Sequence, residues 1–219
     1  MDYLPSKASV SPWLYWSIFP IHRVFMNLYF SKIFTEGLEH LPKSGPFVLA
    51  PKHFSRWDPV IVALVSKEPL WFLTNANQFE KFQGWLIQRL GAFPVDLNHP
   101  TISSLRGAIQ LLQAGKKLVI FPEGGIVRDQ PLRSLKTGLA RLVLQAEAMT
   151  QKTSTIPIIP IALRYEPGAY PRAKVFIHIS PPLYSQDYRQ KNDKQTALAL
   201  TQALQMALIK GLEKIQNRE

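Results

Sequence analysis

The chain contains no cysteine, and histidine is sparse. Without thiols there is no disulfide scaffold, no thiolate metal cluster and no cysteine nucleophile, which fits a reducing compartment. The histidines are too scattered to give the ligand spacing that is typical of metal sites: His22, His40, His53, His99 and His178. The G-x-S-x-G turn of serine hydrolases is also missing. We therefore expect no metal and no other bound cofactor.

Acidic residues are also few. The chain has 15 Asp and Glu and 26 Lys and Arg, which gives a net charge of +11. Such an excess indicates an anionic partner: nucleic acid, an anionic membrane surface or a phosphorylated small molecule. A nucleic-acid-binding module would explain the charge, but the sequence has no recognised binding motif and its aromatic residues crowd the N-terminus. That alternative predicts salt-sensitive oligonucleotide binding that survives His53→Ala. We expect no nucleic acid partner.

Long uncharged apolar runs are also lacking. Residues 12–34 are densely aromatic, yet the longest stretch there without Lys, Arg or His, Ala8 to Ile21, is shorter than the roughly 20 residues that a spanning helix needs. Aromatic residues interleaved with Arg23 and Lys32 are typical of a segment in the lipid interface, and a helix packed on the domain's own core is the equal alternative. We predict a membrane-associating segment over residues 1–35 and a peripheral or monotopic position on the cytoplasmic face of a membrane.

What the chain has in quantity is apolar periodicity, with 46% hydrophobic residues among 219. From Phe47 onward, short apolar runs alternate with stretches of helical period. The runs are 47–50, 69–73, 91–95, 117–122, 156–163 and 174–179, and the helical stretches are 102–115, 134–149 and 196–215. This alternation predicts an α/β fold: a mixed, largely central sheet flanked by helices, forming one domain over residues 36–219 after an N-terminal interfacial helical segment.

A histidine and an aspartate lie in the polar interruption between the first two apolar runs. FVLAP (47–51) has the pattern of a buried strand, and WDPVIVALV (57–65) opens as a helix with Asp58 at the N-cap and Pro59 in the first turn. His53 therefore lies in a strand-to-helix turn, from which its ring can fold back onto the Asp58 carboxylate. Such a pair makes a general base, because the carboxylate holds one ring nitrogen and stabilises the imidazolium. The alternative is that Asp58 only caps the helix.

A second motif, FPEGG at residues 121–125, ends the run that begins at Lys117. A carboxylate followed by two glycines after a strand makes an exposed turn whose backbone amides can approach a ligand closely. We predict that Glu123 orients a hydroxyl and that the Gly124 and Gly125 amides face a developing oxyanion. A tight turn with a surface glutamate is the alternative.

Taken in order, these blocks resemble the glycerolipid acyltransferase family, whose best-known members are the 1-acyl-glycerol-3-phosphate acyltransferases. The resemblance covers residues 36–185 and rests on His-x4-Asp after a strand, Phe-Pro-Glu-Gly further along and the Pro-centred strand IIPIAL (158–163). It implies that His53 and Asp58 form the catalytic dyad and that Glu123 and Gly124 bind the acceptor. It also implies that Pro160 lies near the acyl-donor site.

The resemblance implies an O-acyltransferase that acts on a lysophospholipid in a membrane. The donor is an acyl-CoA or acyl carrier protein thioester, which is a substrate rather than a cofactor. The acceptor is 1-acyl-glycerol-3-phosphate and the product is phosphatidate, in phospholipid biosynthesis. His53 takes the proton of the free hydroxyl as that oxygen attacks the thioester. A lysophospholipid acyltransferase or a tafazzin-like transacylase with another head group is the alternative.

Three positions depart from the family pattern. Lys52 precedes the histidine where the family commonly has asparagine, and Leu97 and Ile126 stand where it commonly has arginines. If the acceptor carries a phosphate, its positive partners come from elsewhere, because guanidinium and ammonium groups near glycine turns are the usual phosphate ligands. We expect at least two of the nearby cations in the site; they are Lys52, Arg56, Arg128, Arg133 and Lys136.

Overall fold

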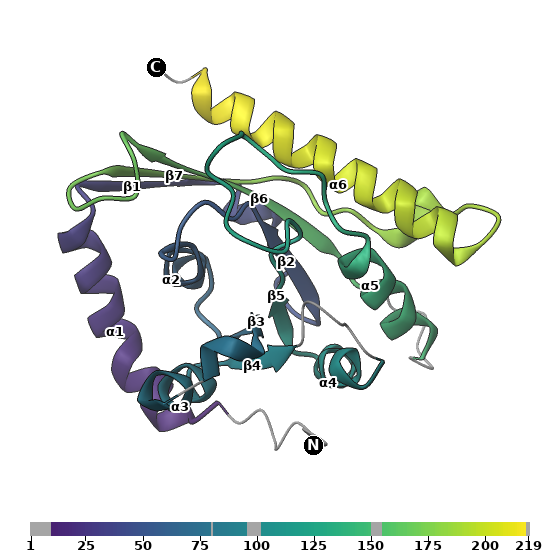
Figure 1. The fold of residues 1–219 in the computed structure, drawn as a ribbon, viewed down its shortest axis with the longest axis horizontal. Coiled ribbons are helices and arrows are strands. Elements are labelled where there is room, and N and C mark those ends of the chain that lie inside the picture. Colours follow the sequence, from purple (N-terminus) through teal and green to yellow (C-terminus); the bar gives the residue numbers. More distant parts are fainter. Residues whose placement is uncertain (1–9, 80, 96–101, 150–154, 218–219) are drawn as a thin grey trace.

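A single mixed sheet organises the protein, as seen in a computed structural model that describes residues 10–79, 81–95, 102–149 and 155–217 (Figure 1). Its strands run in the order β1-β7-β6-β2-β5-β3-β4. They are β1 (Lys32–Glu36), β2 (Phe47–Pro51), β3 (Leu70–Asn75), β4 (Ala92–Val95), β5 (Lys117–Val119), β6 (Ile158–Glu166) and β7 (Lys174–Ile179). Neighbouring strands are parallel except for β6 and β7, which pair antiparallel.

Helices cover both faces of this sheet. They are α1 (Pro12–Tyr29), α2 (Asp58–Val62), α3 (Lys81–Arg89), α4 (Ile102–Gln113), α5 (Gly138–Ala148) and α6 (Asp193–Gln216). Short 3-10 turns occupy Leu38–His40, Ala63–Val65, Ala76–Phe79 and Ser185–Tyr188. In Figure 1, α4, α5 and α6 lie on one side of the sheet, and α1 and α2 lie on the other.

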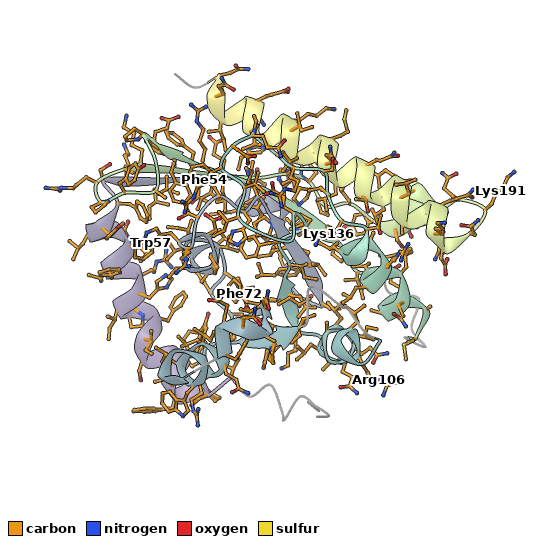
Figure 2. The ribbon with its side chains drawn as sticks, in the orientation of Figure 1. Phe54, Trp57, Phe72, Arg106, Lys136 and Lys191 are labelled. Carbon is orange, nitrogen blue, oxygen red and sulfur yellow. The ribbon has the colours of Figure 1, made fainter. Side chains whose placement is uncertain are left out.

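The alternation of side chains along β2 explains why both faces are covered. Val48 and Ala50 pack into a core cluster with α4, α5 and α6, whereas Phe47 and Leu49 pack into a second cluster with α1 and α2. All five residues of β2 are buried, as expected for a central parallel strand with helices on both faces. In Figure 2, the Arg106 and Lys191 side chains lie at the outer surface. The predicted α/β architecture is confirmed.

Two features of the fold differ from the sequence-based expectation. The pattern of KIFTE (32–36) did not suggest a strand, yet this segment forms β1, an edge strand that pairs with β7. The predicted boundary after residue 35 thus falls inside a strand of the sheet. The helix expected from residue 134 begins at Gly138 instead, because the backbone amides of Arg133 and Lys136 donate to the Glu123 carboxylate and to the Pro122 carbonyl.

Helix α1 packs on the domain's own core, which is one of the two alternatives that the sequence left open. Met26 on its inner face and its C-cap residue Phe30 are each only 1% exposed. Its outer face presents large apolar side chains to the surface, including Trp13 at 78% and Leu28 at 73% exposure. Within the ranges that the structure describes, no helix has the length and apolar character needed to cross a membrane.

Candidate active site

The carboxyl ends of adjacent parallel strands bring the two sequence motifs together. β2 and β5 are paired in register from Phe47 with Lys117 to Leu49 with Val119. His53 follows the end of β2 and Glu123 follows the end of β5, so both lie at the edge of the sheet where α/β proteins commonly bind ligands. The contact is direct, because the His53 backbone N–H donates to Oε1 of Glu123 at 2.8 Å.

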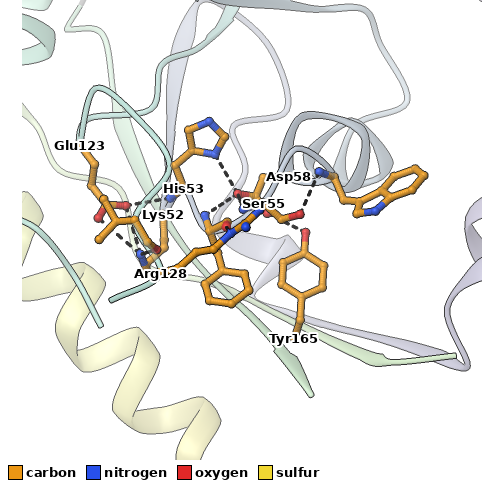
Figure 3. Close-up of polar contacts among 10 residues, drawn as sticks. Lys52, His53, Ser55, Asp58, Glu123, Arg128 and Tyr165 are labelled. Atoms are coloured by element: carbon orange, nitrogen blue, oxygen red, sulfur yellow. Dashed lines mark hydrogen bonds and ion pairs between the residues drawn. The ribbon is translucent and has the colours of Figure 1, made fainter. Parts of the chain in front are cut away.

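His53 and Asp58 form the pair that the spacing predicts (Figure 3). Nδ1 of His53 lies 2.8 Å from Oδ2 of Asp58, which makes Nδ1 the protonated ring nitrogen. Nε2 makes no hydrogen bond with any residue that the structure describes, and His53 lines the main cavity. The ring stacks on Phe121 with centroids 4.0 Å apart. The arrangement leaves Nε2 with a lone pair for a substrate proton.

The Asp58 carboxylate is fully buried, and it accepts hydrogen bonds from backbone N–H groups of the preceding turn instead of capping the helix. Its Oδ2 also accepts from the backbone N–H groups of Phe54 at 2.6 Å and Ser55 at 2.7 Å. Asp58 is the first residue of α2, whose N-cap is Trp57, so the predicted N-cap position is wrong by one residue. The capping alternative therefore does not account for this carboxylate, which organises the loop around His53.

Tyr165 is a site residue that sequence reasoning missed. From the end of β6, its hydroxyl donates to Oδ1 of Asp58 at 2.6 Å. Burial, together with the neighbouring Asp58 charge, raises the pKa of Tyr165 well above its usual value, so the phenol remains a donor. A tyrosine in a buried strand needs a partner for its hydroxyl. From that requirement, the strand IIPIALRYE could have suggested Tyr165 as a hydrogen-bond donor.

Glu123 occupies an interior position, whereas the sequence suggested an exposed turn. Its side chain is 0% exposed and accepts from the amides of His53 and Arg133, at 2.8 and 3.0 Å. The Lys52 ammonium lies 3.4 Å from both carboxylate oxygens and 3.1 Å from the Val127 carbonyl, and this lysine is also buried. Neither Glu123 nor Lys52 lines the cavity, so the structure does not support direct contact of either with a substrate.

The glycine turn faces the cavity next to His53. Gly124 has a left-handed φ of 72°, and its N–H donates to the Phe121 carbonyl at 3.1 Å, so this amide is already engaged. A Cβ at Gly124 would lie 2.8 Å from Cε of Lys136, whose stem crosses the turn. Gly125 also lines the cavity, and its amide makes no backbone hydrogen bond among the described residues, which leaves it as the candidate oxyanion donor.

The structure places the predicted cations unequally. Arg56 is exposed and lines the cavity, while Arg128 is held near the catalytic loop because its Nε donates to the Phe54 carbonyl at 3.2 Å. Arg133 and Lys136 are exposed on the segment that returns from the glycine turn. Of the departures from the family pattern, Ile126 lines the cavity, and Leu97 lies outside the described residues.

A mostly apolar cavity of about 620 Å³ extends from His53 to the inner face of α1. Arg56, Gly124 and Gly125 line it beside His53. Apolar side chains from α1, α2, β3, α3 and β4 make up most of its wall, among them Ile18, Phe19, Val60, Leu70, Phe72, Ile87 and Ala92. Sequence reasoning did not find this cavity, because its wall comes from five elements that are apolar for ordinary packing reasons.

Pro160 lies in the interior of β6, where it pairs with Ala50 of β2. It is buried and does not belong to the cavity wall, so the structure does not place it near a ligand. Its carbonyl accepts from the Ser180 N–H at 3.0 Å, which is a role in the sheet.

Among the described residues there is no group of three His, Cys, Asp or Glu arranged to hold a metal ion.

Known proteins resemble this chain in both sequence and fold. The Acyltransferase family profile matches residues 32–164. The 1-acyl-sn-glycerol-3-phosphate acyltransferase of Bacillus subtilis is 30% identical over 181 residues, which cover 80% of this chain and 85% of that protein. The Streptococcus pneumoniae protein of the same name is 27% identical over 68% of this chain and 54% of its own length.

A solved structure shows the same fold. It is the crystal structure of the 1-acyl-sn-glycerophosphate (LPA) acyltransferase PlsC from Thermotoga maritima, with a TM-score of 0.72 and 19% sequence identity. The match covers 94% of this chain and 82% of that one. The profile match spans more than half of the chain and includes both motifs of the site. This protein therefore belongs to the Acyltransferase family.

Proposed function

We propose that this protein transfers a fatty acyl group from a thioester donor to the free hydroxyl of 1-acyl-sn-glycerol-3-phosphate, forming phosphatidate. The single observation that carries the proposal is a hydrogen-bonded His53–Asp58 pair at one end of a largely apolar cavity. The names of the relatives supply the acceptor, since 1-acyl-sn-glycerol-3-phosphate acyltransferases match most of this chain.

The chemistry follows from the positions of the site groups. Nε2 of His53 removes the hydroxyl proton of the acceptor as its oxygen attacks the thioester carbonyl carbon. Asp58 stabilises the new imidazolium, and the Gly125 backbone N–H donates to the oxyanion of the tetrahedral intermediate. Collapse expels the thiolate, which takes the proton from His53. The products are a diacyl lipid and a free thiol, and no covalent enzyme intermediate is needed.

The cavity offers an acyl chain a site next to the base. Its wall carries mainly aliphatic and aromatic side chains, so a bound chain is removed from water, and the thioester is screened from hydrolysis. The donor is either acyl-CoA or an acylated carrier protein, and both present the same thioester to His53. No cofactor takes part in this scheme.

Cations near His53 supply the charge for the acceptor phosphate. Arg56 lines the cavity, and Arg128 is held beside the catalytic loop through its bond to the Phe54 carbonyl. The stem of Lys136 crosses Gly124 and brings a third positive charge to the same region. These side chains take the place of the family arginines that are missing at Leu97 and Ile126.

The exposed apolar face of α1 supports peripheral association with the cytoplasmic face of a membrane. Trp13, Trp16, Ile21, Val24 and Leu28 are each more than half exposed. An apolar patch of this kind on a basic protein fits the interface of an anionic bilayer, where the acceptor resides.

The test is thiol release by the purified protein from acyl-CoA and, in parallel, from an acyl carrier protein thioester. Acceptor vesicles contain lysophosphatidate, lysophosphatidylethanolamine, lysophosphatidylcholine or no lysolipid. We expect release that requires lysophosphatidate, that is lost in His53→Ala and that falls in Asp58→Asn with little change in KM.

Three outcomes would contradict the proposal. Release without an acceptor would indicate a thioesterase, and release with another lysolipid alone would assign a different head group. Near-wild-type turnover in His53→Ala would exclude this dyad.

A further inference from the structure

The hydrogen bonds to Asp58 come from two separate parts of the chain. Oδ2 accepts from His53, Phe54 and Ser55, which all belong to the loop between β2 and α2. Oδ1 accepts from Tyr165 at 2.6 Å, at the far end of β6 (Figure 3). The loop donors reach Asp58 through local folding of the loop that precedes α2. Tyr165 comes from the sheet, so its bond fixes the Asp58 carboxylate relative to the sheet.

Both parts of this contact are shielded from water. Asp58 is 0% exposed and Tyr165 is 4% exposed. The Tyr165 ring packs against Phe54 and against Phe30, the C-cap residue of α1, each with ring centroids 5.7 Å from its own. A hydrogen bond between a neutral donor and a buried carboxylate is strong, and water is not at hand to replace it.

The four donors share one negative charge. Each donor that withdraws charge from Asp58 weakens the field that the carboxylate exerts on the His53 ring. We propose that Tyr165 is a positioning residue that sets how strongly Asp58 polarises His53, and so fixes the pH range over which His53 acts as a base. The inference rests on the proposed function, in which His53 removes the acceptor proton.

Other charged groups near His53 do not depend on Tyr165. Glu123 accepts the His53 backbone N–H and is paired with Lys52, and Arg128 donates to the Phe54 carbonyl. Arg56 and the titratable His22 of α1 line the same cavity. All of these stay in place when only the Tyr165 hydroxyl is removed. A change in the pH profile of such a variant therefore reports the bond between Tyr165 and Asp58.

Tyr165→Phe is the first variant, because it deletes one oxygen and keeps the ring. With less charge withdrawn from Asp58, the imidazolium is held more firmly, and we expect the acid limb of the kcat/KM profile to move to higher pH by about half a unit to one unit. The plateau falls roughly threefold to tenfold as the carboxylate loses its orientation, with KM nearly unchanged. Tyr188→Phe is the matched control, because this tyrosine packs against the opposite core cluster, and its profile should overlay that of wild type.

A second substitution keeps the hydroxyl and changes its strength. Incorporation of 3-fluorotyrosine at position 165 gives a more acidic phenol and a stronger donor, so the acid limb should move to lower pH. In an Asp58→Asn background, Tyr165→Phe should cost little further activity, because the two residues act as one unit.

NMR titration of the His53 ring in wild type and Tyr165→Phe needs no substrate, and it separates this inference from the proposed reaction. An upward movement of the titration midpoint with no acyl transfer in wild type would refute the reaction and keep the role of Tyr165. Superimposable titrations and pH profiles, a shift to lower pH in Tyr165→Phe, or losses that add in the double variant would overturn the inference and reduce Tyr165 to a packing residue.

Discussion

Replacing Glu123 with glutamine removes the negative charge that accompanies the buried Lys52 ammonium. Taking away one partner of a buried ion pair costs about 3–5 kcal/mol, because the remaining charge is left without compensation. The Lys52–Glu123 separation of 3.4 Å is longer than that of an optimal charge-assisted bond, so the lower end of the range applies. In a chain of this length each kcal/mol corresponds to roughly 2–4 °C in Tm, which gives an expected fall of about 6–12 °C.

Activity should fall in the same variant for a separate reason. A glutamine amide has only one accepting oxygen, so it can keep only one of the bonds that the two carboxylate oxygens now accept from the His53 and Arg133 backbone N–H groups, and the loop that carries His53 is held less firmly. The matched control is the apolar double variant Lys52→Met/Glu123→Met. Replacing both partners of a buried pair is often neutral, but this double variant also leaves the His53 and Arg133 amides without their acceptor, so Tm should recover only in part while kcat stays low.

The assay is calorimetry for Tm and thiol release for kcat and KM, measured on the same preparations. An unchanged Tm together with a raised KM for lysophosphatidate at constant kcat would refute the reasoning. That combination is what a glutamate in direct contact with the acceptor would produce.

Three further tests, two of them with a matched control substitution, address other parts of the molecule. Leu28→Glu, on the exposed face of α1, should weaken vesicle co-sedimentation at least about tenfold without altering Tm, whereas Leu198→Glu, on an exposed site of α6, should leave it unchanged; equal effects would remove the interfacial role of α1. Ala63→Phe narrows the cavity and should shift kcat/KM toward shorter acyl-CoA chains, and an unaltered chain-length profile would exclude acyl binding there. Gly124→Ala and Gly115→Ala, at φ of 72° and 76°, should both lower Tm, since each places a side chain in left-handed backbone. Only Gly124→Ala should also lower turnover, because a lysine stem lies across that glycine and Gly115 faces open space.

The strands of the site and helix α2 were predictable from apolar runs and helix-start residues, whereas α3 in the cavity wall was not among the predicted helical stretches. The pairing of His53 with Asp58 was predictable too, since residues five apart diverge on a continuous helix but can meet in a strand-to-helix turn. The family and the reaction class are confirmed by the relatives that match most of the chain. The roles of individual residues remain predictions for the variants above to decide.

Contacts that depend on tertiary structure were not predictable. Glu123 is held inward by Lys52 and by the amides of His53 and Arg133, so FPEGG alone could not distinguish an inward glutamate from an exposed one. Tyr165 reaches Asp58 only because β6 lies beside β2 in the sheet. The edge strand β1 was hidden because it is short, half exposed and flanked by charged residues.

Helix α1 has apolar side chains on both its inner and its outer face. Tyr15, Ile18 and Phe19 face the cavity, while Trp13 and Leu28 face outward. Deleting residues 1–34 would remove the exposed apolar face of α1, its part of the cavity wall and part of an edge strand together, so loss of activity in such a truncation says nothing specific about lipid binding. In the proposed function, acyl binding and membrane contact depend on the same helix, so chain-length preferences measured in detergent need not equal those measured on vesicles.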